Sequence, residues 1–295
     1  MANPIHILLQ TTIPAIEDDW SIARFSLLRD HLASLKNDHG VPLYKVTARD
    51  REVDHDGNDV VLSVLDESDV DQLWLFAVDT GDGLTSADCE AITRFHQSGG
   101  GIFTTRDHQD LGSSLCTLGG VGRAHFFHSQ HQDPESSRCV RDDMATTTIT
   151  WPNYHSGANG DYQKVTAIEP VHELLCRDGV RVIEYFPAHP HEGAIGVPDG
   201  EEHARVITRG RSQASGREFN LIVAFEARED GHGNRLGRAV AESSFHHLVD
   251  YNWDTSKGCP SFLSEPPGDE IKRDPSRLED VKCYANNVAR WLSRV

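Results

Sequence analysis

Short apolar runs alternate with segments of helical spacing along the first third of the chain. The run "PIHILLQ" at 4–10 predicts a first buried strand, and apolar residues between 19 and 36 recur at the spacing of one helix face. Asp18 or Asp19 is a candidate cap for this helix, and Gly40 lies just past its end. The chain therefore begins as a strand followed by a helix.

Three further strands are predicted before residue 110. "VPLYKVTA" at 41–48 and "QLWLFAVD" at 72–79 are apolar runs of strand length, and the acidic segment 50–70 between them is typical of loop and turn. Three glycines then lead into an apolar run at 101–105. Strands that alternate with helices predict a parallel, doubly wound sheet, whose ligand site lies at the carboxyl ends of the strands.

The helix that precedes the fourth strand has clear sequence signals at both ends. Thr85 and Asp88 have the spacing of a capping box, and Gly99 follows the predicted helix at 85–98. After the fourth strand we expect a short helix at about 110–117, whose amino end would favour a partial negative charge near the strand end.

The second half of the chain has strands, long loops and one clear helix. Apolar runs predict strands at 180–186, 204–210, 219–226 and 237–244. The segments 120–200 and 258–275 have the composition of loops, and the last helix begins at Asp274 and Pro275. We therefore predict an α/β fold with a flavodoxin-like, mostly parallel sheet, long inserted loops and some added strands, in one domain that spans 1–295.

Composition and charge exclude several classes of partner. The chain has 295 residues and a formal net charge of −18, which repels nucleic-acid phosphates and anionic lipid. No run reaches the ~18 apolar residues of a membrane span, and "MANPIHILLQ" lacks the features of a secretory signal. We expect a cytoplasmic protein that binds a small polar molecule and neither nucleic acid nor membrane; the sequence leaves homo-oligomerisation open.

Histidine and cysteine usage direct attention to particular clusters. The 17 histidines are many for this length, and histidine serves both proton transfer near neutral pH and metal binding. The six cysteines are scattered without a CxxC pair, as expected of thiols in a reducing compartment.

Four polar residues directly follow the predicted strand at 101–105. Arg106, Asp107, His108 and Gln109 lie where such sheets carry their ligand sites. We expect Asp107 and His108 to be catalytic, and Arg106 and Gln109 to bind the substrate. The alternative is a solvated loop in which an aspartate caps the next helix.

A second cluster, "ESSFHHLVDYNWD" at 242–254, begins in a predicted strand. A histidine at a strand end with a carboxylate a few residues later is typical of a tuned general base, so we expect His246, His247 and Asp250 to be catalytic. Asn252 is a candidate substrate ligand. Adjacent rings normally face different surroundings, and the sequence does not say which histidine faces the pocket.

Two histidine-containing loops offer further candidates. In "AHFFHSQHQD", His125 and His128 would share one face of a helix and hold a metal ion, but on a strand they would point to opposite faces. In "WPNYHSGANGDYQ" at 151–163, His155 and Asp161 lie among small residues that let a ligand approach, although the same residues also suit an ordinary turn-rich loop.

The segment "AHPHEG" adds a third pair of histidines. On a strand, His189 and His191 would point to the same face, an arrangement that metal sites use, although Pro190 interrupts a regular strand. The sequence therefore implies either no cofactor or a divalent metal ion, namely zinc, iron or manganese.

Four motifs, in order, are "GGGIFTTRDH", "SLCTLGGVGRAHFFH", "IEPVHELL" and "GNRLGRAVAESSFHH". Together they resemble the ThuA-like (trehalose-utilisation) family of the class I glutamine amidotransferase-like superfamily, over about residues 70 to 250. The resemblance implies that superfamily's α/β scaffold and a sugar-like substrate. However, Arg106 stands where an amidotransferase carries its nucleophilic cysteine, and Cys116 comes later, so we do not expect glutaminase activity.

Three functions stay open. The first is a ThuA-like hydrolase, isomerase or lyase that acts on a carbohydrate-like or other small polar substrate by His/Asp acid–base chemistry. The second is a metal-dependent hydrolase or isomerase. The third is a non-catalytic protein that binds a small molecule. The enzymatic hypotheses require the clusters near 106–108 and 246–250 to meet around one cavity.

Overall fold

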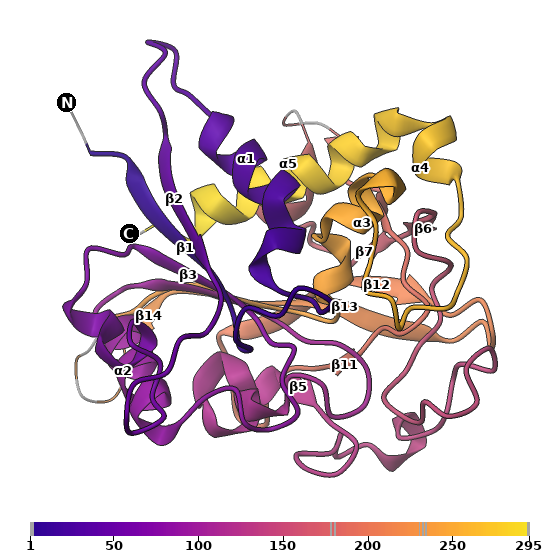
Figure 1. Ribbon diagram of the computed structural model, residues 1–295, viewed down its shortest axis with the longest axis horizontal. Helices are drawn as coiled ribbons and strands as arrows, with labels where there is room; N and C mark the ends of the chain where they lie inside the picture. The colour runs from indigo at the N-terminus through magenta and orange to yellow at the C-terminus, as the bar shows by residue number, and fades with distance from the viewer. Residues whose placement is uncertain are drawn as a thin grey trace.

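An eight-stranded sheet runs through the middle of the molecule (Figure 1). The computed structural model describes residues 3–293 except 178, 180, 230, 232 and 234. The strands, in sheet order, are β2 (Tyr44–Arg49), β1 (Ile5–Thr11), β3 (Gln72–Phe76), β4 (Gly101–Thr105), β16 (Ala239–Glu242), β13 (Glu218–Phe225), β12 (Ala204–Arg211) and β7 (Thr166–Ala167). In this order, every neighbouring pair from β2 to β16 is parallel, whereas the pairs β16–β13, β13–β12 and β12–β7 are antiparallel. The predicted α/β class with a mostly parallel sheet is confirmed.

Five α-helices and four small two-stranded sheets complete the described structure. The helices are α1 (Ser26–Ser34), α2 (Ser86–Gln97), α3 (Asp250–Trp253), α4 (Glu270–Arg273) and α5 (Leu278–Trp291). The small sheets pair β6 (Tyr162–Lys164) with β10 (Tyr185–Pro187), β5 (His125–Phe126) with β11 (Ala194–Ile195), β8 (Cys176–Arg177) with β9 (Arg181–Val182), and β14 (Arg228–Glu229) with β15 (Arg235–Leu236). No helix within the described ranges combines the length and the hydropathy that a membrane span needs.

The side-chain alternation of the central strands builds a core on each face of the sheet. Ile7 and Leu9 of β1 belong to the cluster that also holds the apolar seams of α1 and α5, whereas Leu8 belongs to the cluster that holds α2. Figure 1 accordingly shows α1 and α5 on one side of the sheet and α2 on the other. This arrangement leaves the carboxyl ends of the strands free to carry side chains.

Helix α1 begins later than the pattern predicts. A 3₁₀ turn occupies Ile22–Phe25, and the helix itself starts at Ser26. The predicted caps Asp18 and Asp19 do not serve it, because the helix begins too far along the chain. Asp250 takes this role from a distant segment, since it accepts hydrogen bonds from the Ser26 hydroxyl at 2.5 Å and the Leu27 N–H at 2.7 Å.

At two other element boundaries, one local sequence signal is confirmed and one is wrong. The capping box of Thr85 and Asp88 is confirmed at α2. The predicted helix at 110–117 is wrong: the chain forms a 3₁₀ turn at Ser113–Thr117 after Gly112, whose φ of 84° and close approach to the backbone require glycine.

Two predictions near the second half of the sheet also need correction. The continuous strand predicted at 180–186 is wrong, because β9 and β10 pair in different small sheets; residue 180 lies outside the described residues. Asp274 makes no side-chain capping bond, and Pro275 opens a 3₁₀ turn that leads into α5.

Candidate active site

A cavity of about 500 Å³ lies at the carboxyl ends of β4 and β16. Asp107 and His108 follow β4, and His246 follows β16, so these two clusters face one hollow. A third segment, the loop after β10, adds His189 and His191 to the same wall. The structure thus brings together five of the predicted site residues.

Asp107 lies at the centre of the polar part of this cavity. Its Oδ1 is 3.2 Å from His189 Nε2, and its Oδ2 is 3.4 Å from His246 Nε2. His108 Nε2 is farther, at 4.0 Å from Oδ2. The ligand atoms of Asp107, His189 and His246 all lie within 4.8 Å of one another, which is a spacing that one metal ion could bridge.

The rings of His189 and His246 stack face to face. Their centroids are 3.6 Å apart and their planes differ by 8°. Trp20 packs edge-on against His246, and Phe245 stacks on it from the neighbouring position. His246 is also held by its backbone, since its N–H donates to the Ser244 hydroxyl at 3.1 Å. These contacts fix the direction in which both Nε2 atoms point.

Gly193 lets the loop of His189 approach the strand ends closely. A Cβ at this position would lie 2.6 Å from Arg106 Nη1, 2.6 Å from the Asp107 carbonyl oxygen and 2.8 Å from the Ser243 carbonyl oxygen. The Gly193 N–H donates to that same Ser243 oxygen at 3.2 Å. Only a residue without a side chain fits there, and this close contact holds the loop against both strand ends.

A chain of hydrogen bonds that starts at the backbone fixes the tautomer of His189. The Gly160 N–H donates to Asn252 Oδ1 at 3.0 Å, so the Asn252 amide nitrogen points the other way. There it donates to a backbone carbonyl at 2.8 Å and to Asn159 Oδ1 at 3.0 Å. Asn159 Oδ1 also lies 3.0 Å from His189 Nδ1, and a carbonyl oxygen only accepts, so Nδ1 carries the proton. The neutral ring therefore turns a bare Nε2 toward Asp107.

Two lone pairs consequently face each other between His189 and Asp107. Neither the bare Nε2 nor the carboxylate Oδ1, 3.2 Å away, has a hydrogen to share when the ring is neutral. The contact is favourable when a cation lies between the two atoms. A proton shared by His189 and Asp107 would serve, and so would a metal ion.

The electrostatics of the cluster favour an ionised Asp107, whereas burial disfavours a charge on the histidine rings around it. Burial raises the pKa of Asp107, but the surrounding histidines outweigh it and hold this pKa well below its ordinary value. Burial, together with His246, holds the pKa of His189 well below its ordinary value. Burial likewise lowers the pKa of His246 and of His108.

His191 lies beside the cluster but has different partners. Its Nδ1 is 3.2 Å from Asp143 Oδ2, and its Nε2 is 3.3 Å from Glu265 Oε1. Burial lowers the pKa of His191, yet Asp143, Asp107 and Glu265 outweigh it and raise this pKa. His191 is therefore suited to carry a positive charge at the cavity wall.

His247 does not reach the cavity, which corrects its predicted catalytic role. Its ring lies in the core between two carboxylates, with Nδ1 2.5 Å from Glu242 Oε1 and Nε2 3.0 Å from Glu192 Oε1. Burial lowers the pKa of His247, but Glu192 and Glu242 outweigh it and raise the pKa to about 10. The 3₁₀ turn at Phe245–His247 sends the two adjacent rings in different directions, and His246 is the one that faces the cavity.

Two other predicted residues, Asp250 and Asn252, support the fold around the site. Asp250 orients no ring, because its carboxylate is occupied at the start of α1. Asn252 is fully buried and belongs to the hydrogen-bond chain behind His189 rather than to the substrate surface. The short helix α3 explains both placements, since it turns these side chains away from the cavity.

Arg106 and Gln109 are not among the residues that line the cavity, which corrects their predicted role as substrate ligands. Arg106 is fully buried, its guanidinium stacks over Phe127 at 4.2 Å, and it donates to the Gln109 carbonyl oxygen. Burial lowers its pKa to about 9. Gln109 donates from Nε2 to the Thr150 hydroxyl at 2.8 Å. Successive side chains alternate in direction after β4, so Asp107 faces the cavity and Arg106 the core.

The predicted metal pair of His125 and His128 is wrong. His125 lies on the two-residue strand β5, fully buried, with Nε2 2.9 Å from the Thr104 hydroxyl. His128 is exposed, and its Nδ1 lies 2.9 Å from the Trp151 carbonyl oxygen. No helix forms here to place them on one face.

The loop residues His155 and Asp161 are also absent from the residues that line the cavity. His155 Nδ1 is 3.6 Å from Asp143 Oδ1. Asp161 accepts hydrogen bonds from the backbone N–H groups of Asp269 and Glu270 at 3.0 and 3.1 Å, and so holds the start of α4. Both placements are those of an ordinary turn-rich loop, which is the alternative that the sequence left open for this segment.

Sequence reasoning missed most of the other residues in and around the cavity, among them Trp20, Glu265 and Asp143. Trp20 lines the wall, Glu265 enters from a loop that shows no motif, and Asp143 holds His191 from behind. Nothing in the sequence near Glu265 or Asp143 indicates this role, because their distance from the site along the chain is large. The apolar spacing between 19 and 36 places Trp20 only on a predicted helix face.

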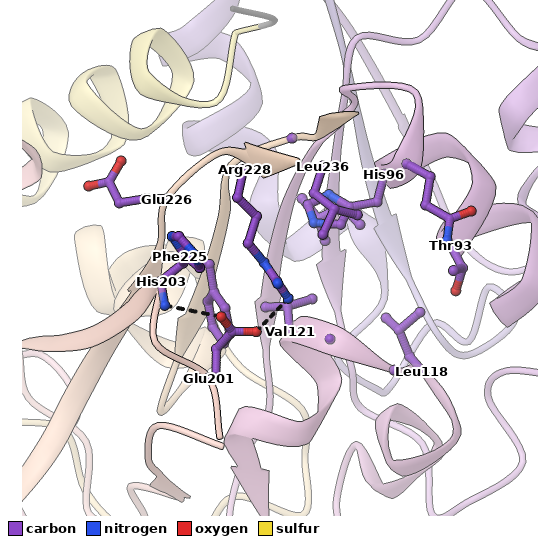
Figure 2. A pocket seen from close by; sticks show the side chains of 15 residues that line it. Thr93, His96, Leu118, Val121, Glu201, His203, Phe225, Glu226, Arg228 and Leu236 are labelled. Carbon is purple, nitrogen blue, oxygen red and sulfur yellow. Dashed lines mark hydrogen bonds and ion pairs between the residues drawn. The ribbon is translucent and has the colours of Figure 1, made fainter. Parts of the chain in front are cut away.

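A second cavity, of about 240 Å³, lies at the amino ends of β4 and β16, away from the candidate site. Figure 2 shows His96 and Leu236 on one wall and the ion pair of Glu201 with Arg228 on another. The described residues that line it include none of the predicted site residues. The first cavity is therefore the one that holds the predicted site residues.

No protein-family model and no curated protein matches this chain. Solved structures similar to it include the mmIFT52 N-terminal domain, with 14% identity over 97% of this chain and 96% of that chain and a TM-score of 0.47. A protein of Bacteroides uniformis described as ThuA-like has 12% identity, coverage of 99% and 93%, and a TM-score of 0.47. The glutaminase domain of Trypanosoma brucei CTPS with bound acivicin has 14% identity, coverage of 96% and 94%, and a TM-score of 0.43. Likenesses of this size assign no activity, so membership of the ThuA-like family stays a prediction.

Proposed function

We propose that the protein is a metal-dependent hydrolase for small molecules, with one divalent ion held by Asp107, His189 and His246. The observation that carries this proposal is the bare Nε2 of His189 facing a carboxylate oxygen at 3.2 Å. Two neutral imidazoles and one carboxylate are a common donor set for zinc and iron, and they leave coordination positions open. An ion there would supply Lewis-acid chemistry to the substrate.

The surrounding residues suit the other tasks of such a reaction. Asn159 Oδ1 accepts a hydrogen bond from His189 Nδ1. Histidines that bind a metal commonly donate their other ring N–H to an oxygen acceptor in this way. His108 is part-exposed at the cavity and 4.0 Å from Asp107, where it can take up or release a proton. Cys116 is not suited to covalent catalysis, because burial raises the pKa of its thiol to about 11.

Metal analysis of the untagged full-length chain tests the proposal. We expect about one equivalent of zinc, iron or manganese after reconstitution, and loss of that metal in Asp107→Asn and His246→Gln. His128→Gln is the matched control, since His128 is exposed and outside the cluster. Less than about 0.2 equivalents in the reconstituted wild type would exclude the metal centre.

Acid–base catalysis without a metal is the second candidate function. It is favoured by the 3.2 Å and 3.4 Å contacts of Asp107, which are also compatible with an imidazolium–carboxylate pair. Nitrogen-15 NMR of the histidine rings distinguishes the two, because an imidazolium at His189 carries protons on both nitrogens. A folded protein with neither metal nor imidazolium, and without hydrolytic turnover, would instead support the binding-protein hypothesis.

A further inference from the structure

Part of the wall of the candidate site is aromatic and aliphatic, beside its polar and ionisable residues. Trp20 and Phe245 pack against His246, at ring-centroid distances of 4.6 and 4.3 Å, so the apolar wall is continuous with the polar cluster. Val78, Leu111, Ile149 and Leu263 also line the cavity. A ligand that reaches Asp107 must therefore lay part of its surface against hydrocarbon.

Phe262 is the most exposed apolar residue of this wall. Its exposed fraction is 58%, which is unusual for a phenylalanine, and it lines the cavity. The segment that carries it is fixed on both sides: the Ser261 N–H donates to Asp18 Oδ1 at 2.7 Å, and the Thr146 hydroxyl donates to Glu265 Oε1 at 3.2 Å. The Phe262 ring is thus held at the cavity, where a bound ligand could cover its exposed surface.

The charges of the cavity disfavour two classes of ligand. None of the described residues that line it is Lys, Arg, Asn or Gln. Phosphate and sulfate esters thus lack the Lys and Arg side chains that usually bind them. His191 can carry a positive charge, but Asp19 and Glu265 add negative charge to the wall. A sugar would find carboxylates, imidazoles and hydroxyls for its own hydroxyl groups, but no side-chain amide among these described residues.

We propose that this cavity takes a small, uncharged molecule with an aromatic or aliphatic ring, whose single polar group reaches Asp107 and the histidines. The cavity volume of about 500 Å³ is in the range of small-molecule sites. The inference rests on the proposed function in taking this cavity as the reaction site. It replaces the carbohydrate-like substrate that the sequence resemblance implied.

Two neutral probes test this ligand class on the full chain. Ligand-observed NMR titration with benzyl alcohol should show binding at least about tenfold tighter than with methyl glucoside, because only the former buries a ring. Phe262→Ser should weaken benzyl alcohol binding about fivefold, the size expected for one aromatic contact. Met144→Ser is the matched control, since Met144 is 69% exposed but does not line the cavity, and it should leave binding unchanged.

Each titration is run on chelator-treated and on metal-loaded protein, so that the two proposals fail separately. Ring binding by protein that takes up no metal would remove the metal centre and keep the ligand class. Metal uptake without benzyl alcohol binding, equal or tighter binding of methyl glucoside, or unchanged binding by Phe262→Ser would overturn the ligand class.

Discussion

Asn159 decides which nitrogen of His189 is available to bind an ion. Its Oδ1 accepts from both Asn252 and His189, whereas its Nδ2 is buried without a hydrogen-bond partner. An aspartate of the same shape would therefore lose no hydrogen bond, although it puts a buried carboxylate oxygen where the unsatisfied donor was. Its negative charge would also make the His189 ring a stronger ligand.

We predict that Asn159→Asp raises the affinity of the site for zinc about tenfold, while Asn159→Leu lowers it by a similar factor. Competition with a chromophoric chelator measures both affinities. Urea unfolding of each variant serves as the control for folding. Equal zinc affinity in the wild type and both folded variants would show that the hydrogen bond to His189 does not tune the site.

At the scale of elements, one buried network joins the loop that carries His189 to the end of β16. Glu192 of this loop accepts from the Ser156 and Ser243 hydroxyls at 2.9 Å each, as well as facing His247. The cationic His247 is the group that compensates two buried carboxylates. The position of the catalytic candidates thus depends on a residue that does not touch the cavity.

We predict that His247→Leu lowers the free energy of unfolding by about 3–5 kcal/mol, because it leaves Glu192 and Glu242 buried without a positive partner. The double variant His247→Leu/Glu242→Gln should regain part of this loss, since one buried charge is removed. Urea denaturation measures both. A single variant as stable as the wild type would contradict the role assigned to His247.

The elements predictable from sequence are those whose signals are local. The strands at 101–105 and 204–210 and the capping box of Thr85 follow from side-chain periodicity and hydrogen bonds within a few residues. The cap that Asp250 gives to α1 lies 223 positions from Leu27, and no local pattern encodes such a contact.

Some residues of the candidate site could likewise be predicted from sequence, and others depend on tertiary packing. Asp107 and His246 were predictable, because parallel strands bring their carboxyl ends to one edge of the sheet. The choice of His246 over His247 depends on a 3₁₀ turn, and the entry of Glu265 depends on how a long loop packs. Both are set by tertiary packing, which the spacing of residue types does not record.

At the scale of the whole molecule, buried neutral histidines make stability depend on pH. Burial and Arg106 hold the pKa of His125 well below its ordinary value. The ring in the unfolded chain titrates near 6.5, so this group leaves stability intact above about pH 6.5 and lowers it as the pH falls further. The unfolded state then binds a proton that the folded state excludes.

We predict that between pH 6.5 and pH 5 the free energy of unfolding falls less steeply with decreasing pH in His125→Gln than in the wild type. The two slopes should differ by about 1.4 kcal/mol per pH unit, the value for one proton. Urea unfolding at several pH values gives the two slopes. His128→Gln, which replaces an exposed ring, should keep the wild-type slope. Identical slopes for His125→Gln and the wild type would mean that His125 is protonated in the folded protein.

The contact at Gly193 sets a boundary for laboratory evolution of this protein. Every amino acid with a side chain would collide there with two backbone oxygens and a buried guanidinium. Mutant libraries that aim at a new specificity should therefore randomise Leu111, Ile149 and Phe262 and hold codon 193 constant. Recovery of active clones with a bulky residue at 193 would mean that the loop backbone can move to accommodate a side chain there.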